Sequence, residues 1–305
     1  MLVFATSDKG GTGRSVTTCN IAYRSALQGR DACYLDFDFG SPTAGAIFGI
    51  PSALRGVKQD GLHTFLRGDC PWPAEIDVWA EADRPALRGH PDGAGQLTLY
   101  PGDEGGSEFA PGPEVVKRCV RLFTRLEEEY AITFVDLSAG RSHALEVVLA
   151  ATAQPALRKA TTRWLVYHRW TQQHIIAAHG LVHGAKGLLV AGEENGHDPA
   201  RLREAIRFVR TAVVNPDSAA SDGLRAEQTS WLREINQGLH QQADRLKVGN
   251  TSALGHVPLD PVLQWREQII SDLDTMRSLI ANQATVDAFE LLAKSLYEDD
   301  AWEAL

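Results

Sequence analysis

The chain is 305 residues long and 44% hydrophobic, which is enough to bury the core of one large domain. Its formal net charge of −9 at pH 7 argues against a general affinity for nucleic acid, although a local basic patch is compatible with that charge. The cysteines are scattered without a C-x-x-C pair, a pattern typical of small, buried, reduced thiols in the cytosol. They are Cys19, Cys33, Cys70 and Cys119.

The beginning of the chain has the pattern of a strand. Met1 is followed at once by the apolar run of residues 2–6. We find no signal-peptide pattern and no apolar run of about 18 residues, so the sequence predicts a cytoplasmic protein without a membrane span.

Residues 9–15, which read K-G-G-T-G-R-S, directly follow this strand and precede a helix predicted over 16–27. A glycine-rich loop in that context is typical of a phosphate-binding loop, because glycines let successive backbone N–H groups curl around phosphate oxygens. The Ser15 hydroxyl is placed to ligate Mg²⁺. Two features depart from the ordinary pattern: Lys9 stands at the front of the loop, and Arg14 replaces the lysine expected before the serine.

Further along, predicted strands and helices alternate as a doubly wound parallel sheet requires. The further strands are predicted at residues 32–37, 96–100, 132–137, 164–167 and 210–214. The helices are predicted near 61–66, at 113–130, near 143–151, from about 171, at 226–246 and, as an amphipathic terminal helix, at 285–303. The sequence thus predicts a single α/β domain over 1–305, with an irregular elaboration near 51–112 and a polar helical segment near 220–250.

Acidic residues end two of the predicted strands. Asp36 and Asp38 lie in Y-L-D-F-D-F-G-S-P, and Asp136 lies in I-T-F-V-D-L-S-A-G. With the loop, these segments resemble the deviant Walker A loop, the switch I strand and the Walker B and switch II segment of the ParA/MinD superfamily of P-loop ATPases. Those ATPases partition plasmids and chromosomes or position cell-division machinery.

The resemblance implies a mainly parallel sheet flanked by helices and a site built for a triphosphate, which needs placed cations, a metal ion and an oriented water. Lys9 would reach across a dimer interface to the partner's phosphates, so an ATP-dependent homodimer is implied. The implied catalytic residues are Lys9, Arg14 and Asp38, and the implied Mg²⁺ ligands are Ser15, Asp38 and Asp136. The implied nucleotide-binding residues are Lys9, Gly10, Gly11, Thr12, Gly13, Arg14, Ser15, Val16, Gly140, Asn215, Pro258 and Asp260.

Adenine recognition is implied by two later segments. V-V-N-P at 213–216 and G-H-V-P-L-D at 255–260 resemble the asparagine and the proline-containing loop that contact the base in the superfamily. Pro216 stands where the superfamily has a basic residue. The alternative is that both segments are strand-end turns, which Asn-Pro and Pro-x-Asp also suit.

Arg14 leaves two interpretations open. Its guanidinium keeps the charge of the usual lysine, but it is larger, planar and forked. Either Arg14 and Lys9 share the lysine's task in a slow ATPase, or the chain binds nucleotide and hardly turns it over. We favour slow hydrolysis, because the metal and water positions are retained.

The remaining candidate sites favour structural roles. His179 and His183 have the i, i+4 spacing of zinc ligands, but no third ligand accompanies them. Residues 297–305 are acidic, which is the wrong charge for a helix that docks on anionic lipid. The basic cluster is predicted to be a solvated helical face, with DNA contact as the alternative. It consists of Arg201, Arg203, Arg207 and Arg210.

Together these features predict an ATP- and Mg²⁺-dependent dimerising switch with weak ATPase activity. It would control the positioning or assembly of a protein partner. The alternative is a non-hydrolysing, nucleotide-bound scaffold that regulates a protein complex. Nucleic acid is a less favoured partner, and a membrane is not expected.

Overall fold

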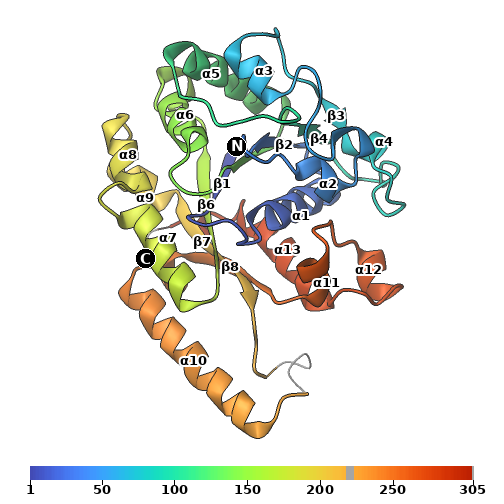
Figure 1. Cartoon of the computed structure of the whole chain (residues 1–305), viewed down its shortest axis with the longest axis vertical. Coiled ribbons are helices and arrows are strands. Elements are labelled where there is room, and N and C mark those ends of the chain that lie inside the picture. The colour runs from blue at the N-terminus through green and yellow to red at the C-terminus, as the bar shows by residue number, and fades with distance from the viewer. Residues whose placement is uncertain (218–222, 304–305) are drawn as a thin grey trace.

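The computed structural model describes residues 1–217 and 223–303. Their strands form a sheet of eight in the order β3-β4-β2-β5-β1-β6-β7-β8. Neighbouring strands are parallel except β3 and β4, which are antiparallel. Figure 1 shows helices on both faces of this sheet, so the predicted doubly wound α/β fold is confirmed.

The strands are β1 Leu2–Thr6, β2 Ala32–Phe37, β3 Ile76–Asp77, β4 Leu97–Tyr100, β5 Ile132–Leu137, β6 Thr162–Arg169, β7 Ile206–Val213 and β8 Ala253–Pro258. The first helices are α1 Arg14–Leu27, α2 Ala44–Phe48, α3 Leu62–Arg67, α4 Val78–Glu81, α5 Pro113–Glu129, α6 His143–Thr152 and α7 Gln172–His183. They are followed by α8 Leu188–Glu194, α9 Pro199–Glu204, α10 Ala226–Arg245, α11 Pro261–Trp265, α12 Asp272–Met276 and α13 Gln283–Ser295.

A hydrophobic core lies on each face of the sheet. On one face α1 and α13 pack together, with Ile21 and Phe289 fully buried. On the other face α5 and α6 pack together, and Phe123 of α5 meets Phe4 of β1 with 5.8 Å between ring centroids. Every residue of β1, β2 and β5 is buried, because helices cover these parallel strands on both sides.

The carboxyl ends of the parallel strands meet at one edge of the sheet. The chain passes from β1 outward to β2 and later returns from β5 across β1 to β6, so the strand order reverses beside β1. In open α/β sheets this reversal creates the crevice where ligands bind. The loop between β1 and α1 lies at that position.

Several predicted elements need correction. The terminal helix ends at Ser295 and does not continue to residue 303, and a 3-10 turn at Asp299–Ala301 then brings Trp302 into the core. The strand predicted from residue 210 begins at Ile206, and β3 and β8 were not predicted. The polar segment near 220–250 contains α10, which projects from the body in Figure 1, while residues 220–222 lie outside the described part of the chain.

The prediction of a solvated basic face is wrong for two of its four residues. Arg207 and Arg210 lie in β7 and are only 6% and 7% exposed. The Arg210 guanidinium stacks on Trp170 at 4.3 Å, and Arg207 donates from Nε to the Ala301 carbonyl oxygen at 2.8 Å. Partners far away in the sequence cover these side chains. All four cysteines are free and buried, as expected.

The expectation that no segment could span a membrane also needs correction. By length and composition alone, residues 172–194 are long and apolar enough to cross a membrane, with a mean hydropathy of 1.3 over 18 residues. In the structure this segment forms α7 and α8, and α7 packs against β6. Helices of a buried protein core have the same length and composition, so these two properties alone do not indicate a membrane span.

His168 in β6 makes the stability of this fold dependent on pH. Burial, opposed by the Nδ1 hydrogen bond to the Arg169 carbonyl oxygen at 3.1 Å, lowers the pKa of His168 from 6.5 to about 4. As the pH falls, His168 is therefore protonated near pH 6.5 in the unfolded chain but only near pH 4 in the folded chain. The resulting stability is fully present above pH 6.5 and is lost as the pH falls through this window.

Between about pH 7 and 4.5, the free energy of unfolding of the wild type should fall. In His168→Phe this fall should be smaller by about 2–3 kcal/mol. The measurement is the free energy of unfolding in urea at several pH values. His143→Phe, at a half-exposed site, is the matched control and should keep the wild-type slope. Identical slopes for wild type and His168→Phe would contradict the assignment.

Candidate functional site

The loop between β1 and α1 forms an open cradle of backbone amides. Gly11 and Gly13 have φ angles of +70° and +75°, a region that glycine adopts without strain. Gly13 is the N-cap of α1 and supplies no side-chain cap. Among the described residues, the N–H groups of residues 11–16 donate no hydrogen bond to the protein. Unpaired amides at the N-terminus of a 14-residue helix are suited to bind an anion such as phosphate.

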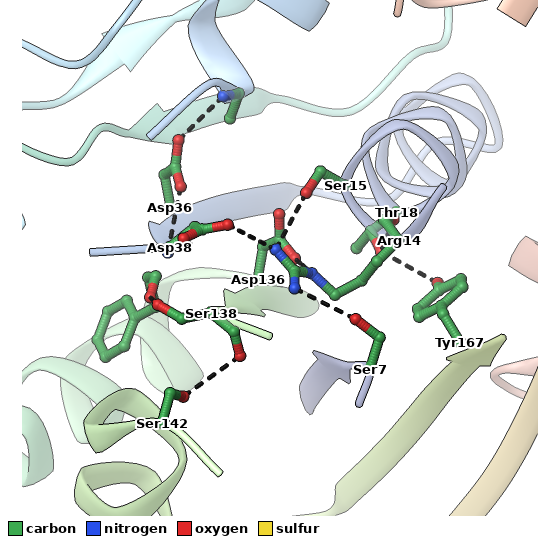
Figure 2. A network of polar contacts seen from close by, with 12 residues as sticks. Ser7, Arg14, Ser15, Thr18, Asp36, Asp38, Asp136, Ser138, Ser142 and Tyr167 are labelled. Carbon is green, nitrogen blue, oxygen red and sulfur yellow. Dashed lines mark hydrogen bonds and ion pairs between the residues drawn. The ribbon is translucent and has the colours of Figure 1, made fainter. Parts of the chain in front are cut away.

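Arg14 lies at the centre of the site, with its side chain 6% exposed (Figure 2). Its Nε donates to Asp136 Oδ1 at 2.5 Å, and its Nη2 donates to Asp38 Oδ2 at 2.9 Å. Nη2 also lies 3.3 Å from Ser15 Oγ, and Nη1 lies 3.4 Å from Ser7 Oγ. One buried cation thus joins the loop to the carboxylates that end β2 and β5.

The carboxylates at this edge interact strongly. Burial lowers the pKa of Arg14, but the nearby charges of Asp136 and Asp38 raise it by more than burial lowers it. The guanidinium therefore stays charged. Tyr34 donates its hydroxyl proton to Asp136 Oδ2 at 2.9 Å, so both carboxylate oxygens of Asp136 are hydrogen-bonded. Burial, followed by the charge of Asp136, raises the pKa of Asp36 to about 8, and Asp36 Oδ2 accepts a hydrogen bond from the Ala44 amide at 2.9 Å.

The loops after β2 and β5 are connected through Ser138. The Phe39 amide donates to Ser138 Oγ at 3.1 Å, and Ser138 Oγ donates to Glu108 Oε1 at 2.5 Å. His63 Nε2 lies 2.9 Å from the Phe39 carbonyl oxygen. A displacement of either loop therefore disturbs contacts made by the other.

Gly140, predicted to offer its N–H to a γ-phosphate, donates that N–H to the Ser7 carbonyl oxygen at 2.7 Å. Its φ of +77° allows the chain to turn at this point. The loop after β5 is thereby tied to the end of β1. A contact between Gly140 and a phosphate stays a prediction, and it requires this bond to open.

The residues predicted to contact the base are only partly brought together. A cavity of about 220 Å³ opens beside the loop at the carboxyl ends of β6, β7 and β8. Asn215 is exposed and is not among the described residues that line this cavity. The predicted residues that do line it are Gly11, Thr12, Gly13, Val16, Pro258 and Asp260.

Asp260 also has a structural role. Its carboxylate is 1% exposed and caps α11 by accepting a hydrogen bond from the Val262 amide at 3.2 Å. Its Oδ2 accepts from the Asn282 amide at 2.8 Å and from Thr285 Oγ1 at 2.7 Å. The turn interpretation therefore accounts for this carboxylate, and a nucleotide contact at Asp260 stays a prediction.

Lys9 is exposed at the front of the loop, and among the described residues its side chain forms no ion pair. Nearby, Asp8 pairs with Arg141 at 3.3 Å. His179, considered above as a zinc ligand, lies with Nδ1 2.7 Å from the Leu246 carbonyl oxygen. In residues 1–217 and 223–303 no group of three or more His, Cys, Asp or Glu residues is arranged to hold a metal.

The predicted Mg²⁺ ligands lie close together, but the Arg14 guanidinium fills the space between them. Ser15 Oγ, Asp38 Oδ2 and Asp136 Oδ1 all lie within hydrogen-bond distance of Arg14. Because the guanidinium already occupies the space between these oxygens and hydrogen-bonds them, the donor set as arranged does not fit a divalent cation.

Sequence reasoning missed several residues that organise the site. Ser7 and Tyr34 contact the Arg14–Asp136 pair, and Thr211 Oγ1 of β7 donates to the Thr12 carbonyl oxygen at 2.5 Å. Ser7 is adjacent to the loop, and proximity in the sequence was a usable signal. Tyr34 and Thr211 come from other strands, and nothing in the local sequence identifies their partners.

Sequence comparison finds no matching family model and no matching curated protein. Solved structures do match. The chain is similar to a chain of the MinC:MinD cell division protein complex of Aquifex aeolicus, with a TM-score of 0.61 and 16% identity over 97% of this chain and 95% of that one. It is also similar to MinD with Mg-ADP from Pyrococcus horikoshii OT3 (TM-score 0.54, 14% identity, 98% of both chains). A third match is a McdA–ATP complex from Cyanothece (TM-score 0.57, 11% identity, 97% and 95%). The chain therefore has the fold of the MinD and McdA proteins, and the fold implied by the resemblance is confirmed.

Replacing Arg14 tests how far the site depends on its charge. We expect Arg14→Met to reduce the free energy of unfolding by about 3–5 kcal/mol, because it leaves Asp136 buried with an uncompensated charge. Arg14→Lys keeps the charge and should cost less. Chemical denaturation of the three proteins measures this, and a loss below about 1 kcal/mol for Arg14→Met would contradict a buried ion pair.

Proposed function

We propose that this chain is a cytoplasmic, ATP-dependent dimerising switch with weak ATPase activity that controls the positioning or assembly of a protein partner. The observation that carries the proposal is the row of unpaired N–H groups at the start of α1, beside the carboxylates that end β2 and β5. A triphosphate is bound by such amides and by a cation placed near them, which here is the Arg14 guanidinium held by those carboxylates. The fold shared with MinD bound to Mg-ADP and McdA bound to ATP supports an adenine nucleotide as the ligand.

The geometry suggests how the nucleotide lies. The amides of Gly11 to Ser15 bind the β-phosphate, and the dipole of α1 adds to the attraction. The base and sugar extend toward the cavity beside Val16 and Pro258. That cavity, at about 220 Å³, is smaller than an ordinary ligand pocket of about 300–1,000 Å³, so it accommodates only part of the molecule.

Dimerisation in this proposal depends on Lys9. Because the side chain is exposed and forms no ion pair among the described residues, its charge is available to a second molecule. Two triphosphates facing each other across an interface repel strongly. A lysine from each chain on the opposite nucleotide offsets this repulsion, which makes association depend on bound ATP.

Turnover is expected to be slow, because Arg14 holds the carboxylate that would orient the attacking water. Asp38 Oδ2 pairs with Arg14 at 2.9 Å, so this oxygen is already bound by the guanidinium and is not free to orient the attacking water. The same contact favours a second candidate, a scaffold that binds nucleotide without hydrolysing it. The Mg²⁺ predicted from the sequence would require Arg14 to release Ser15, Asp38 and Asp136.

Titration calorimetry with ATP, ADP and GTP tests the ligand. We expect heat with ATP, and light scattering should show a shift from monomer to dimer when ATP is added. Absence of heat and of any thermal shift with all three nucleotides would overturn the proposal.

Lys9→Ala should keep most of the affinity for ATP and lose the ATP-dependent dimer, because its charge acts on the opposite nucleotide. Lys117→Ala on α5, another exposed lysine, is the matched control and should dimerise like the wild type. Light scattering with and without ATP provides the measurement. A dimer that forms without nucleotide and survives Lys9→Ala would show that the facing-nucleotide arrangement is wrong.

Arg14→Lys separates the slow ATPase from the non-hydrolysing scaffold. If the guanidinium slows the chemistry by holding Asp38, the lysine variant should release phosphate about tenfold faster, which is about 1.4 kcal/mol of barrier. Steady-state phosphate release at saturating ATP measures it. An unchanged or lower rate would indicate a loop already adapted to arginine, which favours the scaffold.

A further inference from the structure

The guanidinium of Arg14 lies where the sequence places a divalent cation. The three side chains predicted to surround Mg²⁺ are the ones that Arg14 contacts: Ser15 Oγ at 3.3 Å, Asp38 Oδ2 at 2.9 Å and Asp136 Oδ1 at 2.5 Å (Figure 2). A positive charge is therefore present at the metal position as part of the chain itself.

The hydrogen bonds of this cluster leave little capacity for a metal ion. Asp136 is 1% exposed, and its second oxygen accepts the Tyr34 hydroxyl at 2.9 Å. Ser7 Oγ lies 3.4 Å from the guanidinium on its other side. A divalent cation could reach Asp136 only by displacing Arg14 and leaving a buried guanidinium without its carboxylates, which is costly.

The shape of the side chain explains why arginine suits this position. A guanidinium spreads five N–H donors over a planar fork, whereas a lysine ammonium places three donors at one point. The fork reaches Asp136 through Nε and Asp38 through Nη2 at the same time. The bonds to these two carboxylates and to Ser7 and Ser15 leave the guanidinium one N–H that can serve a phosphate oxygen.

We infer that Arg14 takes the place of the divalent cation, so that this chain binds the phosphates of a nucleoside triphosphate without Mg²⁺. The inference rests on the proposed function for the presence of a nucleotide, but the competition between Arg14 and a metal does not depend on it. Arg14 and Lys9 supply the positive charge that Mg²⁺ supplies in metal-dependent nucleotide-binding sites. Metal and guanidinium exclude each other, because both need Asp38 and Asp136.

Metal alone, without nucleotide, tests the competition. Thermal unfolding is measured for wild type, Arg14→Met and Arg24→Met, each with Mg²⁺, with Mn²⁺ and with EDTA. Arg24 is the matched control because it is equally buried and pairs with Asp272 and Glu290, whose carboxylates are half exposed and lie away from the loop.

We expect the unfolding temperature of the wild type to be the same with metal and with EDTA. Arg14→Met should unfold at a lower temperature and be partly restored by Mg²⁺ or Mn²⁺, because its freed carboxylates and Ser15 then bind the ion. Arg24→Met should be destabilised and not restored. Stabilisation of the wild type by metal as large as that of Arg14→Met would overturn the inference.

ATP titrations in EDTA and in Mg²⁺ test the consequence and do not require Arg14→Met to fold. The wild type should bind ATP with affinities that agree within about threefold in the two buffers, whereas Arg14→Lys should gain about tenfold or more from Mg²⁺. Binding by the wild type only in Mg²⁺ would overturn the inference and leave the proposed function intact. No binding in either buffer would overturn the proposed function, and the metal-alone experiment would still decide the role of Arg14.

Discussion

A positive charge buried between two carboxylates holds the working edge of this sheet together. Arg14 begins α1, Asp38 follows β2 and Asp136 lies in β5, so one guanidinium connects three segments that are distant in sequence. Removing one partner from such a group leaves an uncompensated charge in a low-dielectric site. The bond from Tyr34 to Asp136 completes the cluster and fixes the direction in which the Asp136 carboxylate faces. The geometry of the loop therefore depends on this ion pair as much as on its glycines.

Hydrogen bonds beside this cluster connect the loop after β1 to the loops after β2 and β5. Gly140 donates its amide to the Ser7 carbonyl oxygen, and Ser138 binds the Phe39 amide, so the loops after β1, β2 and β5 form one hydrogen-bonded unit. A phosphate that attracts the guanidinium or the Gly140 amide would weaken contacts in all three loops at once. The proposed switch needs a local change of charge that alters a larger element, and this arrangement would provide it.

Local chemistry explains which features could be predicted from the sequence. The strand–glycine loop–helix pattern is encoded in consecutive residues, and the acidic ends of β2 and β5 follow apolar runs, so the fold and the position of the site were accessible. The direction of Arg14 was not, because it depends on Asp38 and Asp136, which only the folded sheet brings near it. Arg207 was misplaced for a related reason: its cover comes from Ala301 and Trp302, almost a hundred residues later.

In the proposed function, nucleotide binding and nucleotide hydrolysis place opposite requirements on Asp38. A carboxylate paired with a guanidinium helps to hold a buried cation beside the phosphates, which favours binding. The same pairing occupies the Oδ2 oxygen that would orient the attacking water, which would slow hydrolysis. A lysine at position 14 has no planar fork with which to bind both Asp38 and Asp136. These opposite requirements therefore arise only with arginine at this position. In the proposed function, arginine at position 14 would therefore favour holding the nucleotide over turning it over, and a long-lived nucleotide-bound state would suit a switch that acts on a protein partner.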